Sequence, residues 1–158
     1  MKKVLMIVGG AHHPFGPCGR IGKQFLETTG KYELDVTEDL DALPRLGPYD
    51  AVMVYTCGLE MTPEQFESLR EFVRDGGGLV GVHSATASFR NQPEWFDLVG
   101  SEFLTHPREH PHFRVRIADP DHSITARLGE FDITDEFYRL TDVRDDTGMS
   151  RCQDAIIR

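Results

Sequence analysis

The chain alternates short apolar runs with segments of helical periodicity, and this alternation constrains its fold more than any other feature. Strand-length apolar runs occupy residues 4–8, 51–55 and 79–82, and "YELDVTE" alternates polar and apolar residues over 32–38. The periodicity between these runs is that of helices. Strand, helix, strand, helix and strand in this order predict right-handed crossovers and a parallel, doubly wound α/β sheet.

The first helix is predicted over residues 18–29. Ile21, Phe25 and Leu26 recur there at helical spacing, and Gly30 stands where a helix would end. The run at residues 4–8 that precedes it is apolar throughout, which is typical of a parallel strand buried on both faces. The run at residues 79–82 is predicted to be a buried strand that ends at His83.

The second helix has the clearest start signal in the chain. Thr62 is the predicted N-cap, Pro63 takes the first helical position and Gln65 completes a capping box. Its predicted buried stripe consists of Phe66, Leu69, Phe72 and Val73. Elsewhere we predict a loop or broken helix at "LDALPRLGPYD", a short helix at "EWFDLVG", strands at "EFLTH", "HFRVRIA" and "DEFYRL", and a turn at "DHSITARLG".

Length and charge bound the kind of protein. At 158 residues we expect a single domain spanning 1–158, and a net charge of −9 repels nucleic-acid phosphates and anionic membranes. We therefore expect a small neutral or polar ligand, with no nucleic acid and no membrane as partner. No apolar run approaches the roughly 20 residues of a membrane helix, and the first residues lack a signal-peptide core. Three widely spaced cysteines, Cys18, Cys57 and Cys152, predict free thiols and a cytoplasmic protein.

Polar residues follow several of the predicted strands. Because loops that leave the carboxyl ends of parallel strands share one crevice, these residues are expected to lie at one edge. The group consists of His12, His13, Thr56, Cys57, Glu60, His83, Ser84, Thr86 and Ser88. Glu60 has an alternative interpretation as a first-turn acid that the following helix dipole favours, and Cys57 as an inert apolar side chain.

His83 interrupts an apolar run where an aliphatic residue would pack at lower cost. Gly81 and Ala85 flank it, which predicts a sharp turn resembling a nucleophile elbow, with backbone N–H groups able to hold a ligand oxygen. The elbow normally presents serine or cysteine, and Ser84 stands one position too late. We therefore expect His83 to be functional without a conventional acyl-enzyme mechanism.

A histidine-rich stretch, "FLTHPREHPHF", lies further along the chain. Its spacing matches no zinc signature, and Pro107 and Pro111 exclude two ligands one helical turn apart. His110 and His112 are expected to be exposed, whereas His106 follows an apolar pattern and is expected to point inward. His13, His83 and His106 are the predicted shared site, with or without a divalent ion such as zinc.

Three longer patterns together resemble the ThuA-like, or trehalose-utilisation, family over residues 2–140: "YTCGLEMTPEQFESLREFVRDGGGLVGVHSATASF", "WFDLVGSEFLTHP" and "DPDHSITARLGEFDITDEFYRL". The resemblance implies a flavodoxin-like fold of the class I glutamine amidotransferase type and a role in the use of trehalose or related disaccharides. Amidotransferases of this fold carry cysteine at the elbow, so His83 argues against glutaminase activity. Family domains continue well past "DEFYRL", which leaves a shortened or divergent end, or a segment packed against a second subunit in a homodimer.

The resemblance carries five positions over to this chain, namely His13, Glu60, His83, Ser84 and His106. We expect a sugar-processing protein in which His83 acts as general acid, general base or metal ligand, assisted by His106 and His13. Substrate-binding roles are expected for Ser84, Glu60, Thr86 and Thr56. Two alternatives remain: a non-catalytic sugar-binding or regulatory module, and a metal-dependent hydrolase.

Overall fold

A computed structural model describes residues 1–141 and 155–157 of the chain. It divides into two compact units, Met1–Val99 and Gly100–Arg158, each of which we describe by itself. The prediction of one domain over 1–158 stays a prediction. Cys152 lies outside the described residues, within which Cys18 and Cys57 form no disulfide.

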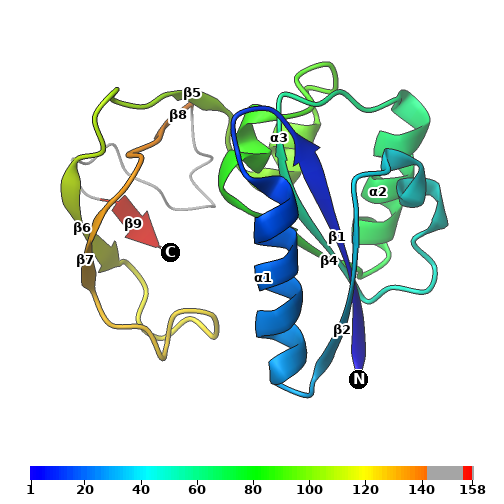
Figure 1. Ribbon diagram of the computed structural model, residues 1–158, viewed down its shortest axis with the longest axis horizontal. Coiled ribbons are helices and arrows are strands. Elements are labelled where there is room, and N and C mark those ends of the chain that lie inside the picture. The colour runs from blue at the N-terminus through cyan, green and yellow to red at the C-terminus, as the bar shows by residue number, and fades with distance from the viewer. Residues whose placement is uncertain (142–154, 158) are drawn as a thin grey trace. The chain divides into compact units, whose positions relative to one another are not determined.

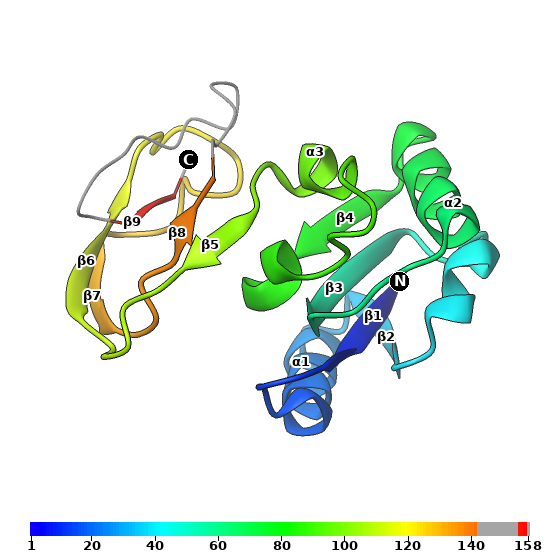
Figure 2. The same ribbon diagram turned by 90° about the horizontal axis from the view of Figure 1, so that it is seen from above.

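The first unit is built on a parallel sheet of four strands. These are β1 (Lys2–Gly10), β2 (Tyr32–Thr37), β3 (Ala51–Cys57) and β4 (Gly78–Gly81) (Figure 1). They lie in the order β2-β1-β3-β4, which Figure 2 shows. All three pairings are parallel, so the predicted α/β sheet is confirmed. β1 and β3 occupy the centre, and six consecutive residues of β1 are buried as expected for a strand covered on both faces.

Helices cover both faces of this sheet (Figure 2). α1 (Phe15–Thr28) lies on one face, and α2 (Pro63–Arg74) and α3 (Trp95–Val99) lie on the other. Two short 3₁₀ helices, η1 (Leu40–Arg45) and η2 (His83–Ala87), follow β2 and β4. Two apolar cores result. Val52, Val54, Leu69, Phe89 and Trp95 belong to the core beneath α2 and α3, and Val4, Met6, Val8, Phe15, Leu34 and Tyr55 form the core beneath α1.

α2 confirms its predicted start in detail. The Thr62 hydroxyl accepts a hydrogen bond from the Gln65 N–H at 3.2 Å, and the Gln65 side chain accepts one from the Thr62 N–H at 2.9 Å. Both halves of the capping box are therefore present, with Pro63 at the first helical position. Phe66 and Leu69 are buried, and Phe72 and Val73 pack against the same core.

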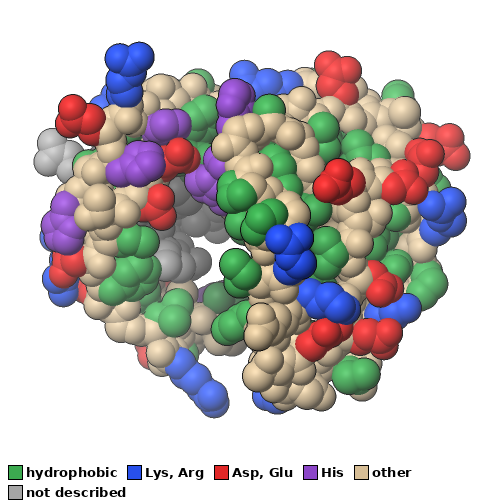
Figure 3. Space-filling model, in the orientation of Figure 1, with side chains coloured by type: hydrophobic (Ala, Val, Ile, Leu, Met, Phe, Trp, Pro, Cys, Tyr) green, Lys and Arg blue, Asp and Glu red, His purple; other side chains and the backbone are tan. Residues whose placement is uncertain are grey.

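α1 departs from its prediction in two ways. It begins at Phe15, three residues before the predicted start, and Ile21 and Phe25 are 66% and 71% exposed. Hydrophobic side chains accordingly gather over α1 in Figure 3. The helix instead rests on the sheet through Gly19, where a Cβ would come within 2.9 Å of Val36. Because a small residue brings the helix close to the strands, the spacing of large apolar residues did not mark its buried face.

β4 corrects a second expectation, since it is an edge strand and is not fully buried. Within the described part of the chain it pairs only with β3. Val80 is 47% exposed, and the flanking Gly78 and Gly81 are exposed as well. Its apolar sequence predicted a buried strand, but among the described residues only one edge of the strand has a neighbour.

The second unit contains two small sheets. β5 (Phe103–Thr105) pairs antiparallel with β8 (Arg139–Leu140). β6 (His112–Ile117) pairs antiparallel with β7 (Phe131–Thr134) and parallel with β9 (Ala155–Ile157). The predicted strands at "EFLTH" and "HFRVRIA" are confirmed. The prediction of a strand across "DEFYRL" is wrong for all but its last two residues, and β7 and β9 were not predicted.

Among the described residues, no helix combines the length and the apolar character needed to cross a membrane.

Candidate functional site

The end of β1 shapes the first part of the site. Gly10 has φ +107°, and a Cβ at this position would overlap the carbonyl group of Cys57. Only glycine fits both requirements. The chain then turns away from the sheet through a hydrogen bond from the Ala11 N–H to the Cys57 carbonyl at 3.0 Å, and His12 and His13 follow. Gly10 therefore sets where these histidines leave the sheet.

The end of β4 shapes the second part. The Val82 N–H donates to the Val54 carbonyl at 2.8 Å, and His83 then takes a left-handed conformation with φ +49° as the first residue of η2. A non-glycine residue in this region carries strain that clusters at functional positions. The sequence predicted a sharp turn here, and His83 presents an exposed side chain at that turn.

The two parts meet in a pair of imidazoles. The rings of His13 and His83 have centroids 4.8 Å apart and planes at 72°. Tyr55 lies beside both, with its ring centroid 5.9 Å from that of His13 and 6.1 Å from that of His83. Phe15 packs edge-on to His13 at 5.6 Å. The structure thus brings two of the three predicted histidines together at the carboxyl edge of the sheet, where open α/β sheets bind ligands.

A layer of hydroxyl groups is buried within the first unit. Thr56, Ser84 and Ser88 each expose 0% of their surface. The Thr56 hydroxyl donates to the Ser88 Oγ at 2.8 Å, whereas the Ser84 Oγ has no hydrogen-bond partner among the residues the structure describes. The predicted sugar-binding roles of Thr56 and Ser84 remain predictions, and both side chains are completely buried.

The other predicted residues of the first unit are more exposed. Glu60 is exposed in the loop before α2, and Thr86 is half-buried with its hydroxyl donating to the His83 carbonyl at 3.4 Å. His12 is exposed and has φ +75°. The structure does not test Glu60 or Thr86 as ligands for a sugar.

His106 belongs to the second unit, so its predicted grouping with His13 and His83 stays a prediction. Its ring stacks on Tyr138 with centroids 5.9 Å apart and planes at 18°. Its Nδ1 lies 2.8 Å from the Pro107 carbonyl oxygen, and its Nε2 lies 3.9 Å from Glu136 Oε1. His110 reaches the same carboxylate oxygen at 3.8 Å. His106 is thus half-buried, and His110 is exposed as expected.

The metal alternative depends on the donor set. Within residues 1–141 and 155–157, no group of three or more His, Cys, Asp or Glu side chains is arranged to hold a metal ion. His13 and His83 supply two imidazoles, whereas catalytic zinc sites use three protein ligands. The third predicted donor, His106, belongs to the other unit, so the metal role predicted for His13, His83 and His106 stays a prediction, and no step of the proposed chemistry uses a metal.

Comparison with known proteins places the fold and these residues in a family. The family model named ThuA, described as trehalose utilisation, matches residues 3–152. The chain belongs to the ThuA family. Among curated proteins, none matches this chain.

Two solved structures of ThuA-like proteins share its fold. The protein from Bacteroides uniformis matches this chain with a TM-score of 0.71 and 20% sequence identity, and the match covers 90% of this chain and 62% of the Bacteroides uniformis chain. The protein from Parabacteroides merdae matches this chain with a TM-score of 0.76 and 21% sequence identity, and the match covers 87% of this chain and 62% of the Parabacteroides merdae chain. The ThuA chain therefore spans less than two thirds of the length of either relative. The likeness confirms the predicted flavodoxin-like fold.

Two aromatic residues of this ThuA domain join the site without having been predicted. Phe15 and Tyr55 both contact His13, and their own rings are 5.0 Å apart. The sequence signal for Tyr55 was the alternation of side chains along β3, which places Tyr55 on the opposite face of the sheet from Thr56. Only polar residues at strand ends were predicted to belong to the site, so Thr56 was included and Tyr55 was not.

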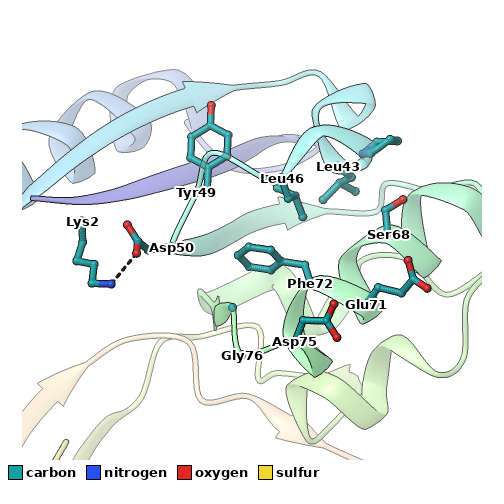
Figure 4. A pocket seen from close by; sticks show the side chains of 13 residues that line it. Lys2, Leu43, Leu46, Tyr49, Asp50, Ser68, Glu71, Phe72, Asp75 and Gly76 are labelled. Atoms are coloured by element: carbon teal, nitrogen blue, oxygen red, sulfur yellow. Dashed lines mark hydrogen bonds and ion pairs between the residues drawn. The ribbon is translucent and has the colours of Figure 1, made fainter.

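A hollow of about 520 Å³ lies at the other edge of the ThuA sheet, among residues that precede the strands (Figure 4). Phe72 and Leu43 contribute apolar walls, and Lys2 and Asp50 form an ion pair of 2.6 Å at its side. The hydrogen bond from Lys2 lowers the pKa of the Asp50 carboxyl. None of the site residues predicted from the sequence lines this hollow. We place the candidate site at the histidine pair because ligands of open α/β sheets bind beyond the carboxyl ends of the strands.

Proposed function

We propose that this ThuA domain acts on trehalose or a related disaccharide through His13 and His83. The observation that carries the proposal is the contact between the two imidazole rings, 4.8 Å apart at the carboxyl edge of the sheet. The family description, trehalose utilisation, supports the choice of sugar class. An acidic chain with a net charge of −9 also suits a neutral ligand better than a phosphorylated one.

The chemistry proposed for the pair is proton transfer. Histidine is the side chain that most readily gives and takes protons near neutral pH. Two adjacent imidazoles can divide the roles, one donating a proton to a sugar oxygen while the other accepts a proton from a hydroxyl group or water. The exposed ring of His83 gives a ligand access, and the strained turn fixes where that ring leaves the backbone.

A covalent mechanism at the elbow has less support. The tip residue is His83, and the hydroxyl of the adjacent Ser84 is completely buried. The nucleophile of a conventional elbow must reach the substrate. The proposal therefore assigns no acyl-enzyme step to Ser84, and the glutaminase chemistry of related folds is not proposed.

The experiment compares His13→Ala and His83→Ala with wild-type protein in two assays. Trehalose and related disaccharides are titrated by calorimetry, and the reaction mixtures are analysed for product by chromatography. Loss of a general acid or base lowers turnover by about 10²- to 10⁴-fold, and both variants should remain folded with a melting temperature close to that of wild type. His12→Ala is the matched control, since His12 is an exposed neighbour in the same loop.

The outcomes separate the alternatives. Product that disappears in His13→Ala and His83→Ala but not in His12→Ala supports the proposal. Heat of binding without product supports a sugar-binding module and contradicts catalysis. Neither heat nor product across the disaccharides tested contradicts both.

A further inference from the structure

Tyr55 stands on the strand that separates the two histidine loops. The sheet order is β2-β1-β3-β4, so β3 lies between the strand that leads to His13 and the strand that leads to His83. Tyr55 pairs in register with Val8 on β1, two residues before that strand ends. Among the described strands of the first unit, β3 alone borders both β1 and β4, so a side chain near its end is placed to contact both loops.

The rings around Tyr55 form one cluster. Tyr55 contacts His13 with ring planes at 38°, and His83 with ring planes at 52°. Phe15, the first residue of α1, packs against both Tyr55 and His13 at steep angles. Such tilted and edge-to-face pairs stabilise one another beyond simple burial, by about 0.5–1.5 kcal/mol for aromatic pairs in general. The two histidines thus belong to a single aromatic cluster.

Burial makes Tyr55 the fixed member of this cluster. Tyr55 is 8% exposed and Phe15 is 7% exposed, and both belong to the core beneath α1. His83 is exposed and His13 is half-buried. His13 also lies in a glycine- and proline-containing loop beside the left-handed His12. A loop of this kind needs packing from outside to hold a side chain in one place.

We infer that Tyr55 is a positioning residue, whose ring holds His13 and His83 at the separation needed for them to act together. The inference rests on the proposed function of the pair, but the positioning itself is a property of the folded protein. Tyr55 is not assigned contact with the sugar, because its side chain is buried. Small displacements of reacting groups reduce rates strongly, so loss of the ring should lower turnover without removing either imidazole.

The first test needs no substitution. In full-length protein with isotope-labelled histidine, the imidazole protons of His13 and His83 should both show nuclear Overhauser contacts to the Tyr55 ring. The inference would be overturned if the Tyr55 ring lacked a contact to either of the two imidazoles. This measurement uses wild-type protein, so it does not depend on whether a substituted protein folds.

The second test compares Tyr55→Leu with Tyr55→Phe by the nuclear Overhauser contact between the imidazole protons of His13 and His83. Tyr55→Leu removes the ring and should weaken this contact, while Tyr55→Phe keeps the ring and should preserve it. Tyr32→Leu is the matched control, since Tyr32 packs against the same core at the start of β2. An unchanged contact between His13 and His83 in Tyr55→Leu would overturn the inference.

The functional consequence is measured on the same proteins with the disaccharide assay. Tyr55→Leu should lower kcat by about tenfold or more, with a smaller effect on KM, and Tyr55→Phe should recover most of the loss. Unchanged kcat in Tyr55→Leu would contradict the link between position and turnover. Loss of the contact between His13 and His83 in Tyr55→Leu, together with a wild-type protein that has no disaccharide activity, would retain the positioning role and reject the proposed function.

Discussion

His13 and His83 meet edge to face with ring centroids 4.8 Å apart, although they follow strands that are not neighbours in the sheet. β3 lies between those strands and supplies Tyr55 to the contact. The pair therefore depends on the sheet order β2-β1-β3-β4 and on the loops at its carboxyl edge. Substitutions in the first unit can test each part of this arrangement.

The left-handed backbone of His83 should cost stability that glycine would recover. With φ at +49°, His83→Gly should be about 1 kcal/mol more stable than His83→Ala, because glycine adopts this region without steric cost. Urea unfolding of the two variants measures the difference. His12→Gly and His12→Ala, at φ +75°, should differ in the same direction. Equal stability of the two His83 variants would contradict the assigned strain.

Gly10 should tolerate no side chain. Gly10→Ala combines a positive φ with overlap of the Cys57 carbonyl, and should lower the free energy of unfolding by about 2–4 kcal/mol. Gly30→Ala is the control: Gly30 has φ +67°, but a methyl group there would meet no described atom within 4 Å, so the expected loss is about 1 kcal/mol. Chemical denaturation measures both losses. A loss at position 10 no larger than that at position 30 would show that the close approach to Cys57 is unimportant.

The capping box of α2 should stabilise the unit independently of the histidine site. Thr62→Ala removes the acceptor for the Gln65 N–H and should cost about 1 kcal/mol. Thr62→Ser keeps the hydroxyl and should restore most of that loss. Chemical denaturation of both variants measures the effect, and equal losses for alanine and serine would argue against the cap.

Acid should remove a stabilising contribution from Asp50. Hydrogen bonds from the Lys2 ammonium and the Lys3 N–H lower the pKa of the Asp50 carboxyl from its ordinary value of 3.8. A carboxyl whose pKa is lowered by folding stabilises the protein above pH 3.8, and this contribution is lost as pH falls through the lowered pKa. Asp50→Asn should therefore be less stable than wild type at neutral pH, and the gap should narrow below pH 3.8.

The gap at Asp50 is measured by denaturation of both proteins across the acid range, at low and high salt. Screening should reduce it, because the pair is exposed to solvent. A difference that stays constant from neutral pH down to strong acid would contradict the assigned ion pair.

The sequence sufficed for features that depend on local patterns. Apolar runs predicted the parallel strands, and Thr62, Pro63 and Gln65 predicted the start of α2. Both features depend on residues that are close together in the sequence. The grouping of His13 with His83 followed from the rule that parallel strands share a carboxyl edge.

Features that depend on tertiary contacts were harder to predict. The exposure of Ile21 and Phe25 follows from the way Gly19 lets α1 approach Val36. The exposure of Val80 follows from the edge position of β4. Tyr55 belongs to the site because β3 lies between β1 and β4, and the order of strands in a sheet cannot be predicted from local sequence patterns.

The most direct test of the histidine pair is a double-mutant cycle on disaccharide turnover with His13→Ala, His83→Ala and the double variant. Residues that act as one unit are strongly non-additive, so each single variant should lose nearly as much kcat/KM as the double variant does. Losses that simply add in free energy would contradict the claim that His13 and His83 work as a pair.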